Sequence, residues 1–174
     1  VSNFTSNPGC LNDSVSFVDQ STIPTGSITN WSWDFGDGPG TSTSQNPTYT
    51  YTSPGTYTVT LITTSNDGCS DTTTQTITIN PLPTSDFDFV INGNSSAFGL
   101  LGGCLNTTDT IFFTNNSAVA APDNITAYLW DFDDGSTSTL QNPTHAYTSA
   151  GTYNVQLIVE TNNGCSDTSE VPII

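Results

Sequence analysis

The second half of this 174-residue sequence is a copy of the first. Residues 46–72 and 142–168 are identical at 18 of 27 positions. Shorter motifs recur at similar offsets of 94 to 97 residues: WDFGDG at 33–38 with WDFDDG at 130–135, and CLN at 10–12 with CLN at 104–106. A repeat of this length predicts two homologous domains in tandem.

The repeat also sets the domain boundaries. We expect one domain over residues 1–80 and a second over 85–174. The joining residues 81–84 contain two prolines, which favour a short, extended linker. The second copy carries an additional segment at 92–103, rich in Gly and Ser, that is either a long loop or an added edge hairpin.

Apolar residues alternate with polar ones in both copies. Tyr57, Val59 and Leu61 are separated by threonines, and Tyr153 and Val155 follow the same rule. This period of two, with breaks at Pro, Gly and Asn every 8 to 12 residues, is typical of antiparallel β-sandwiches. No segment has helical periodicity, so the expected fold is all-β with two immunoglobulin-like sandwiches and no significant helix.

The order of motifs resembles a known family. WDFGDG at 33–38 is followed by Asn46-Pro47, Tyr51 and GTYTVTL at 55–61, and the second copy repeats these landmarks. The pattern resembles the PKD (polycystic kidney disease) domain, and the GCSDT segments resemble PKD repeats of secreted Bacteroidota proteins. The resemblance implies an immunoglobulin-like sandwich that serves as a non-catalytic spacer, stalk or adhesive module. Asp133 replaces the glycine of the family motif, at a position that can require positive φ.

The charge balance excludes several functions. The chain has 16 acidic residues and no Lys or Arg, for a net charge of −16. It therefore cannot form a lysine Schiff base, and its surface would repel nucleic acid and anionic membranes. No apolar run approaches the ~20 residues of a membrane-spanning helix, so direct membrane insertion is not expected.

Four cysteines occur in a polar chain, which favours an oxidising, extracellular location. They are Cys10, Cys69, Cys104 and Cys165. Three pairings are possible, and the repeat symmetry favours one disulfide within each domain. A closed loop of about 60 residues would stabilise each domain by about 4 kcal/mol. A cysteine metal site is the alternative, but it needs clustered ligands that this spacing does not offer.

Aspartates gather in the glycine-containing turns. These residues are Asp34 and Asp37 in the first copy and Asp131, Asp133 and Asp134 in the second. Their carboxylates can cap the turn by accepting backbone hydrogen bonds, which we favour because the motif is general to the family. The alternative is calcium, which prefers such oxygen ligands, and Asp133 makes the second copy the better candidate. No cofactor is required by either interpretation.

His145 is the only histidine and thus the only candidate general base at neutral pH. Its counterpart in the first copy is Tyr49, which indicates a packing or strand-surface position. The carboxylates lie in repeated structural motifs, and no pattern indicates a cleft. We therefore expect no catalytic residues and no enzymatic activity.

Glycosylation is a further hypothesis. Asp-Ser/Thr sequences resembling the O-glycosylation signal of Bacteroidota occur at Ser14, Thr72 and Thr110. Asn-x-Ser/Thr sequons occur at Asn3, Asn12, Asn30, Asn94, Asn106, Asn115 and Asn124. In a chain this rich in Asn, Ser and Thr, several sequons arise by chance.

Three functions are compatible with these observations. The favoured one is a protease-resistant structural or adhesive spacer of a secreted or cell-surface protein, whose partners are neighbouring copies or other domains of that protein. The second is a filament subunit joined head to tail through the terminal strands, the last of which looks cut short, or through the 92–103 segment. The third is a carbohydrate-binding module, which needs exposed aromatics such as Trp31, Tyr49 and Tyr51.

Overall fold

The computed structural model describes residues 1–91 and 110–174. Within these residues every regular element is a β-strand, which confirms the expected all-β class. The chain divides into two compact units, Val1–Pro81 (unit 1) and Leu82–Ile174 (unit 2). The segment predicted as a loop or hairpin at 92–103 lies outside the described residues.

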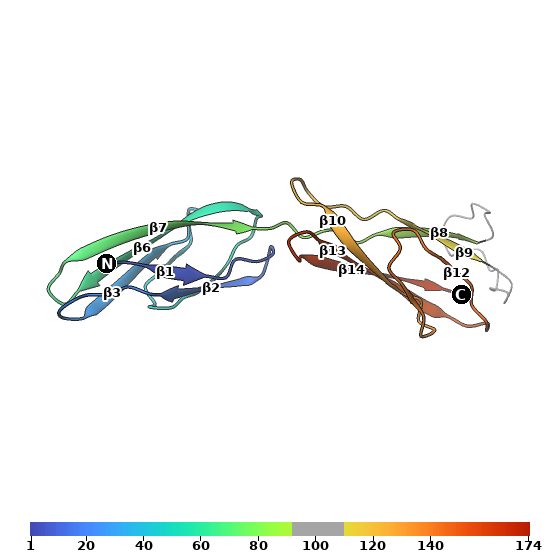
Figure 1. Ribbon diagram of the computed structural model, residues 1–174, viewed down its shortest axis with the longest axis horizontal. Coiled ribbons are helices and arrows are strands. Elements are labelled where there is room, and N and C mark those ends of the chain that lie inside the picture. The colour runs from blue at the N-terminus through green and yellow to red at the C-terminus, as the bar shows by residue number, and fades with distance from the viewer. Residues whose placement is uncertain (92–109) are drawn as a thin grey trace. The chain divides into compact units, whose positions relative to one another are not determined.

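Unit 1 is a sandwich of two antiparallel sheets (Figure 1). The smaller sheet has the strand order β1-β2-β5, and the larger has β4-β3-β6-β7. The strands are β1 (Phe4–Ser6), β2 (Ser14–Asp19), β3 (Ile28–Asp34), β4 (Thr41–Ser42), β5 (Thr48–Thr50), β6 (Gly55–Ser65) and β7 (Ser70–Ile79).

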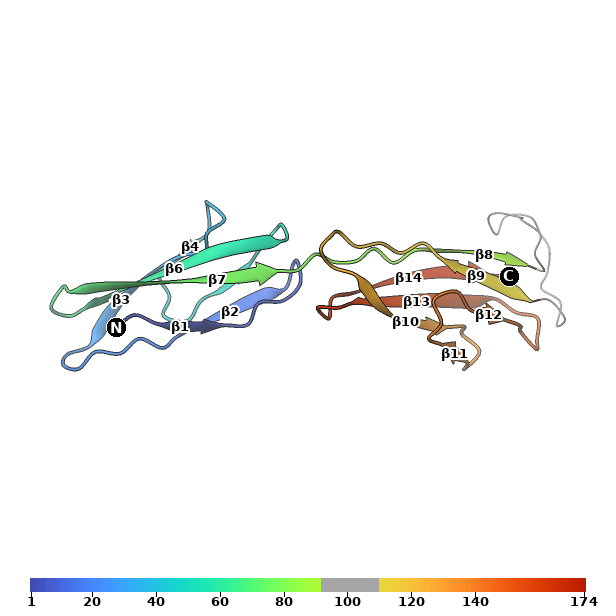
Figure 2. The same cartoon turned by 45° about the horizontal axis from the view of Figure 1, so that its top comes forward.

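Unit 2 repeats this arrangement (Figure 2). Its sheets have the orders β12-β9-β8 and β11-β10-β13-β14. The strands are β8 (Phe87–Ile91), β9 (Ile111–Asn115), β10 (Ile125–Asp131), β11 (Thr137–Ser138), β12 (Thr144–His145), β13 (Tyr153–Thr161) and β14 (Ser166–Ile173). The tandem immunoglobulin-like architecture expected from the repeat is thereby confirmed.

The alternating sequence pattern explains how each sandwich closes. On β6, Val59 and Leu61 are fully buried, whereas Thr60 between them is half-buried and Thr58 and Ile62 on either side are exposed. Trp33 on β3 lies in the same core, and its ring meets that of Phe4 edge to face at 5.1 Å. In unit 2, Trp130 meets Phe87 in the same way at 4.9 Å. Burial of one face of each sheet is the main driving force for this fold.

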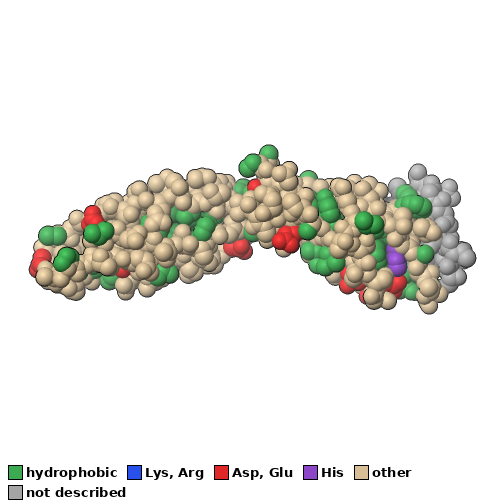
Figure 3. All heavy atoms as spheres, viewed as in Figure 1, with side chains coloured by type: hydrophobic (Ala, Val, Ile, Leu, Met, Phe, Trp, Pro, Cys, Tyr) green, Lys and Arg blue, Asp and Glu red, His purple; other side chains and the backbone are tan. Residues whose placement is uncertain are grey.

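The chain has a net charge of −16, but its acidic groups are few among many uncharged polar side chains. Figure 3 shows mostly uncharged polar side chains and backbone, with acidic groups scattered among them. No helix among the described residues is long and apolar enough to span a membrane.

Candidate functional site

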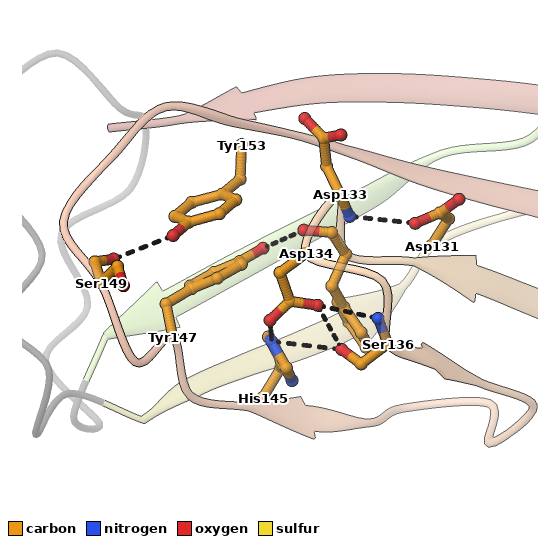
Figure 4. A network of polar contacts seen from close by, with 9 residues as sticks. Asp131, Asp133, Asp134, Ser136, His145, Tyr147, Ser149 and Tyr153 are labelled. Atoms are coloured by element: carbon orange, nitrogen blue, oxygen red, sulfur yellow. Dashed lines mark hydrogen bonds and ion pairs between the residues drawn. The ribbon is translucent and has the colours of Figure 1, made fainter.

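The aspartate-containing turn of unit 2 follows β10, and its carboxylates bind the turn itself (Figure 4). Asp131 accepts a hydrogen bond from the backbone N–H of Asp133 at 2.9 Å. Asp134 accepts hydrogen bonds from both the backbone N–H and the hydroxyl of Ser136. These contacts cap the turn, as local side-chain to backbone hydrogen bonds do.

His145 belongs to the same network. Its Nε2 lies 2.8 Å from Oδ2 of Asp134, and its ring stacks on Phe132 with the planes 5° apart. Tyr147, also next to the imidazole, donates its hydroxyl hydrogen to the carbonyl of Phe132 at 2.9 Å. The histidine therefore packs against the turn, in agreement with the packing position indicated by the sequence.

The network changes the acidity of Asp134. Partial burial raises its pKa, but the hydrogen bonds from Ser136 and the interaction with His145 outweigh this effect. The net result is a pKa below the usual value of 3.8. This carboxyl is thus held as a carboxylate that accepts hydrogen bonds, and not as a proton donor.

Unit 1 builds the same turn with tyrosine in place of histidine. The hydroxyl of Tyr49 donates to Oδ2 of Asp37, whose Oδ1 accepts the backbone N–H of Gly40 at 2.9 Å. Tyr49 stacks on Phe35 with ring centroids 4.3 Å apart. The hydrogen bond to Asp37, with burial and the charge of that carboxylate, raises the pKa of Tyr49 to about 12.

The turns differ at the fourth residue of the motif, Gly36 in unit 1 and Asp133 in unit 2. Gly36 has a φ of 79°, and an added Cβ would lie 2.4 Å from the carbonyl oxygen of Thr58. Asp133 occupies the equivalent position with a φ of 60°, which confirms the positive φ expected there. Oδ2 of Asp133 accepts a hydrogen bond from the backbone N–H of Asn154 at 2.9 Å. This bond connects the Asp133 side chain to β13.

The predicted calcium ligands are thus already engaged within the protein. Within residues 1–91 and 110–174, no group of three or more His, Cys, Asp or Glu is placed to hold a metal ion. In unit 1, Asp34 accepts the backbone N–H of Gly36 at 2.8 Å, the same contact that Asp131 makes in unit 2. This geometry is that of a capped turn.

The aromatic residues considered for carbohydrate binding do not form an open platform. Tyr51 is buried, with its hydroxyl bonded to the carbonyl of Phe35. Trp31 is half-buried against the core, and its indole N–H donates to Asp19 at 2.7 Å. Tyr49 is half-buried and stacks on Phe35.

The predicted disulfide between Cys10 and Cys69 is wrong. Among the cysteines of the described residues, Cys69 is an exposed free thiol, whereas Cys10 and Cys165 are disulfide-bonded. Cys69 immediately precedes β7, but Cys10 pairs with Asn80, immediately after that strand. Ten strand residues span about 33 Å, far beyond the ~7 Å limit between disulfide-bonded Cα atoms. Cys104 lies outside the described residues.

The described glycosylation candidates lie mostly on the surface. Those that are exposed are Ser14, Thr72, Asn3, Asn12, Asn30 and Asn124. Thr110 and Asn115 are half-buried, and Asn94 and Asn106 lie outside the described residues. Glycosylation of any of them stays a prediction.

The sequence analysis missed a contact that connects the segment just before the first strand of each unit to the last strand of that unit. The backbone N–H of Ser2 donates to Asp71 at 2.7 Å, and Ser85 donates to Asp167 at the same distance. The Ser2 hydroxyl also donates to the carbonyl of Leu61. The repeated Asp of the GCSDT segment was the available signal, because it occurs in both copies.

Comparison with known proteins assigns the family. A model of the PKD domain matches residues 4–80 and 103–173, which is most of the chain. The chain therefore belongs to the PKD-domain family.

Individual relatives match over single domains. Pre-pro-metalloprotease PrtV of Vibrio cholerae is 45% identical over 60 residues, 34% of this chain and 6% of that protein. Collagenase ColA of Bacillus cereus is 35% identical over 75 residues, 43% of this chain and 7% of that protein. The crystal structure of the PKD1 domain of PrtV has 41% identity and a TM-score of 0.42, covering 45% of this chain and 93% of that domain. The chain thus spans less than a tenth of these curated relatives.

Proposed function

We propose that the chain is a non-catalytic, load-bearing spacer within an extracellular protein. The observation that carries this proposal is the hydrogen bond that connects the segment just before the first strand of each unit to its last strand. Asp71 in unit 1 and Asp167 in unit 2 make it through the same backbone hydrogen bond. A force applied along the chain enters each unit at these strands, so the tie resists their separation.

Unit 1 has a second connection of this kind, between the segment after β1 and the residue that follows β7. Leu11 and Asn80 share a backbone hydrogen bond of 2.8 Å, and the N–H of Asn80 donates to the carbonyl of Gly9 at 3.0 Å. The bridge between Cys10 and Asn80 is parallel. Tension applied to two parallel neighbouring segments makes them slide past each other. The two backbone hydrogen bonds of Asn80 must therefore break at the same time. This geometry supports a mechanical role.

Three further observations support an extracellular, non-catalytic role. Cys10 and Cys165 are disulfide-bonded, as is usual for proteins in oxidising compartments. The chain has no Lys or Arg, so trypsin-like proteases have no cleavage site. The match to PrtV and ColA covers 6% and 7% of those proteins, which is compatible with an accessory part of a larger chain.

Binding assays separate this role from carbohydrate recognition. The chain is incubated with insoluble polysaccharides and then with a broad-specificity protease, and the bound fraction and the remaining intact chain are measured. A spacer stays unbound and resists digestion, and the variant Asp71→Ala is digested faster than Asp67→Ala, a matched exposed control. Retention on one polysaccharide, or rapid digestion of the native chain, contradicts the proposal.

A further inference from the structure

We propose that Asn163 is a deamidation site that the folded unit 2 protects, and that its conversion to aspartate weakens this unit because the new carboxylate faces Asp123. The modification is independent of the spacer role. Asn163 is exposed in the turn between β13 and β14, and Gly164 follows it. An asparagine loses its side-chain ammonia most readily before glycine, which has no side chain to hinder ring closure.

The reaction needs only water as a co-reactant. The backbone nitrogen of Gly164 attacks Cγ of Asn163 and gives up its proton to water. The C–N bond of the side-chain amide breaks, and the leaving nitrogen takes up a proton and departs as ammonia. Water then opens the resulting succinimide ring at either carbonyl. The product is aspartate or isoaspartate at position 163, which carries a negative charge that the amide did not have.

The folded turn holds the reacting groups apart. The N–H of Gly164 donates to the carbonyl of Thr161 at 3.0 Å, and Gly164 has a φ of 79°. Nδ2 of Asn163 donates to Oδ1 of Asp123 at 2.9 Å. The hydrogen bond of Gly164 must break before its nitrogen can attack. Deamidation should therefore be slower in the folded unit than in the open one.

The surroundings of Asp123 make the product unfavourable. Asp123 is 8% exposed, and among the described residues its Oδ2 has no hydrogen-bond partner. A carboxylate at position 163 could not donate to Oδ1, so two negatively charged acceptors would face each other. The chain has no Lys or Arg that could pair with either of them. Deamidation thus replaces a hydrogen bond to a buried carboxylate with a repulsion.

The same contact can be recognised in unit 1 by its backbone geometry. The N–H of Asn66 donates to the carbonyl of Ser27, and the N–H of Ser27 donates to Oδ1 of Asn66. Asn162 and Asn124 form this reciprocal pair in unit 2. The β6–β7 turn with the segment before β3 is therefore equivalent to the β13–β14 turn with the segment before β10.

The residues beside these pairs show which combinations occur. Unit 1 has Asp67 on the turn and Gly26 on the opposite segment, whereas unit 2 has Asn163 on the turn and Asp123 on the opposite segment. Each unit has one carboxylate at this contact. An aspartate on the turn is compatible with unit 1 because Gly26 has no side chain, but deamidation would give unit 2 both carboxylates.

The consequence is a record of opening. Unit 2 becomes modified when it opens, and the modified unit is less stable and opens more often. Because hydrolysis of the succinimide does not restore the amide, the change is permanent for that chain.

The rate of deamidation is measured first, on the full chain in mildly alkaline buffer with and without denaturant. Samples are digested with pepsin in acid, and mass spectrometry quantifies the Asn163 peptide separately from the other Asn-Gly sequence at 92–93. We expect conversion to be about tenfold or more faster in denaturant. Equal rates, or no conversion of Asn163 in denaturant, would overturn the inference.

The effect on stability is tested with three variants. Asn163→Asp copies the product, Asp123→Asn/Asn163→Asp exchanges the amide and the carboxylate, and Asp67→Asn is the matched change in unit 1. Peptide-resolved hydrogen exchange follows the amides of β13 for unit 2 and of β6 for unit 1. We expect Asn163→Asp to speed exchange of β13 by about tenfold or more, because a buried carboxylate loses its donor.

The exchanged pair should return β13 to within about twofold of the native rate, since one carboxylate again faces one amide. Asp67→Asn should leave β6 unchanged. Native exchange in Asn163→Asp, or no recovery in the exchanged pair, would overturn the inference. If Asn163→Asp does not fold, a folded exchanged pair supports the inference and an unfolded one contradicts it. Protease resistance and polysaccharide binding of the native chain test the spacer role separately.

Discussion

The imidazole of His145 lies parallel to the ring of Phe132, with centroids 4.2 Å apart. Tyr49 stacks on Phe35 in the equivalent place, at 4.3 Å. Each of the two side chains also bonds the aspartate at the fifth motif position of its turn, Asp37 or Asp134. The two units therefore use one packing arrangement, with a tyrosine in unit 1 and a histidine in unit 2.

Acid should weaken unit 2 through Asp134. The folded-state pKa of this carboxyl is below 3.8, so its contribution is fully present above pH 3.8 and is lost as the pH falls through the folded value. Replacement by Asn should lower the free energy of unfolding of unit 2 by about 1 kcal/mol at pH 7 and flatten its acid dependence. Denaturant unfolding between about pH 5 and 2 measures this. Asp86→Asn, an exposed change in the same unit, should have no such effect.

Alkali should weaken unit 1 through Tyr49. Its pKa is raised from 10 to about 12 in the folded state, so its stabilising contribution is present below pH 10 and is lost as the pH rises through 12. Tyr49→Phe should remove this part of the alkaline dependence. Unfolding followed across that range in Tyr49→Phe and in Tyr49→His, which copies unit 2, provides the comparison. An unchanged slope in both variants would count against the hydrogen bond to Asp37.

Exchange of the fourth motif residue between the units should change the stability of the two units by different amounts. Gly36→Asp places a Cβ against the carbonyl of Thr58, so it should destabilise unit 1 by about 2 kcal/mol or more. Asp133→Gly loses the hydrogen bond to Asn154 but relieves a non-glycine residue at positive φ, so the net change should stay within about 1 kcal/mol. Thermal unfolding of both variants tests the pair. Equal destabilisation would mean that the turns do not differ as described.

Removal of calcium should leave both units unchanged. The carboxylates of Asp131, Asp133 and Asp134 already accept hydrogen bonds from the protein. We therefore expect the same melting temperature in excess chelator and in millimolar calcium. A rise in melting temperature with calcium that disappears in Asp133→Gly would establish a metal site in this turn.

The fold was predictable because the repeat and the period of two are local properties of the sequence. Val59 and Leu61 alternate with polar residues and are buried as expected. The capping role of Asp34 was predictable for the same reason, since its partner Gly36 is two residues away. The packing position of His145 followed from its alignment with Tyr49, whereas its stacking on Phe132 did not.

The cysteine pairing was not predictable from symmetry. The nearly equal spacing of the two cysteines in each copy indicated a bond within each unit, but spacing along the chain does not reveal that β7 separates Cys10 from Cys69. The hydrogen bond between Ser2 and Asp71 was missed for a related reason. Ser2 and Asp71 are 69 positions apart, and the donor is a backbone N–H that any residue could supply.

The most direct test of the spacer account is single-molecule extension of the whole chain between handles at its two ends, under reducing conditions. The account predicts two separate unfolding events, one for each unit, with Asp71→Ala lowering the unfolding force of one event and Asp167→Ala that of the other. Asp67→Ala should leave both forces unchanged. Extension at negligible force, or forces that do not respond to either tie variant, would contradict the account.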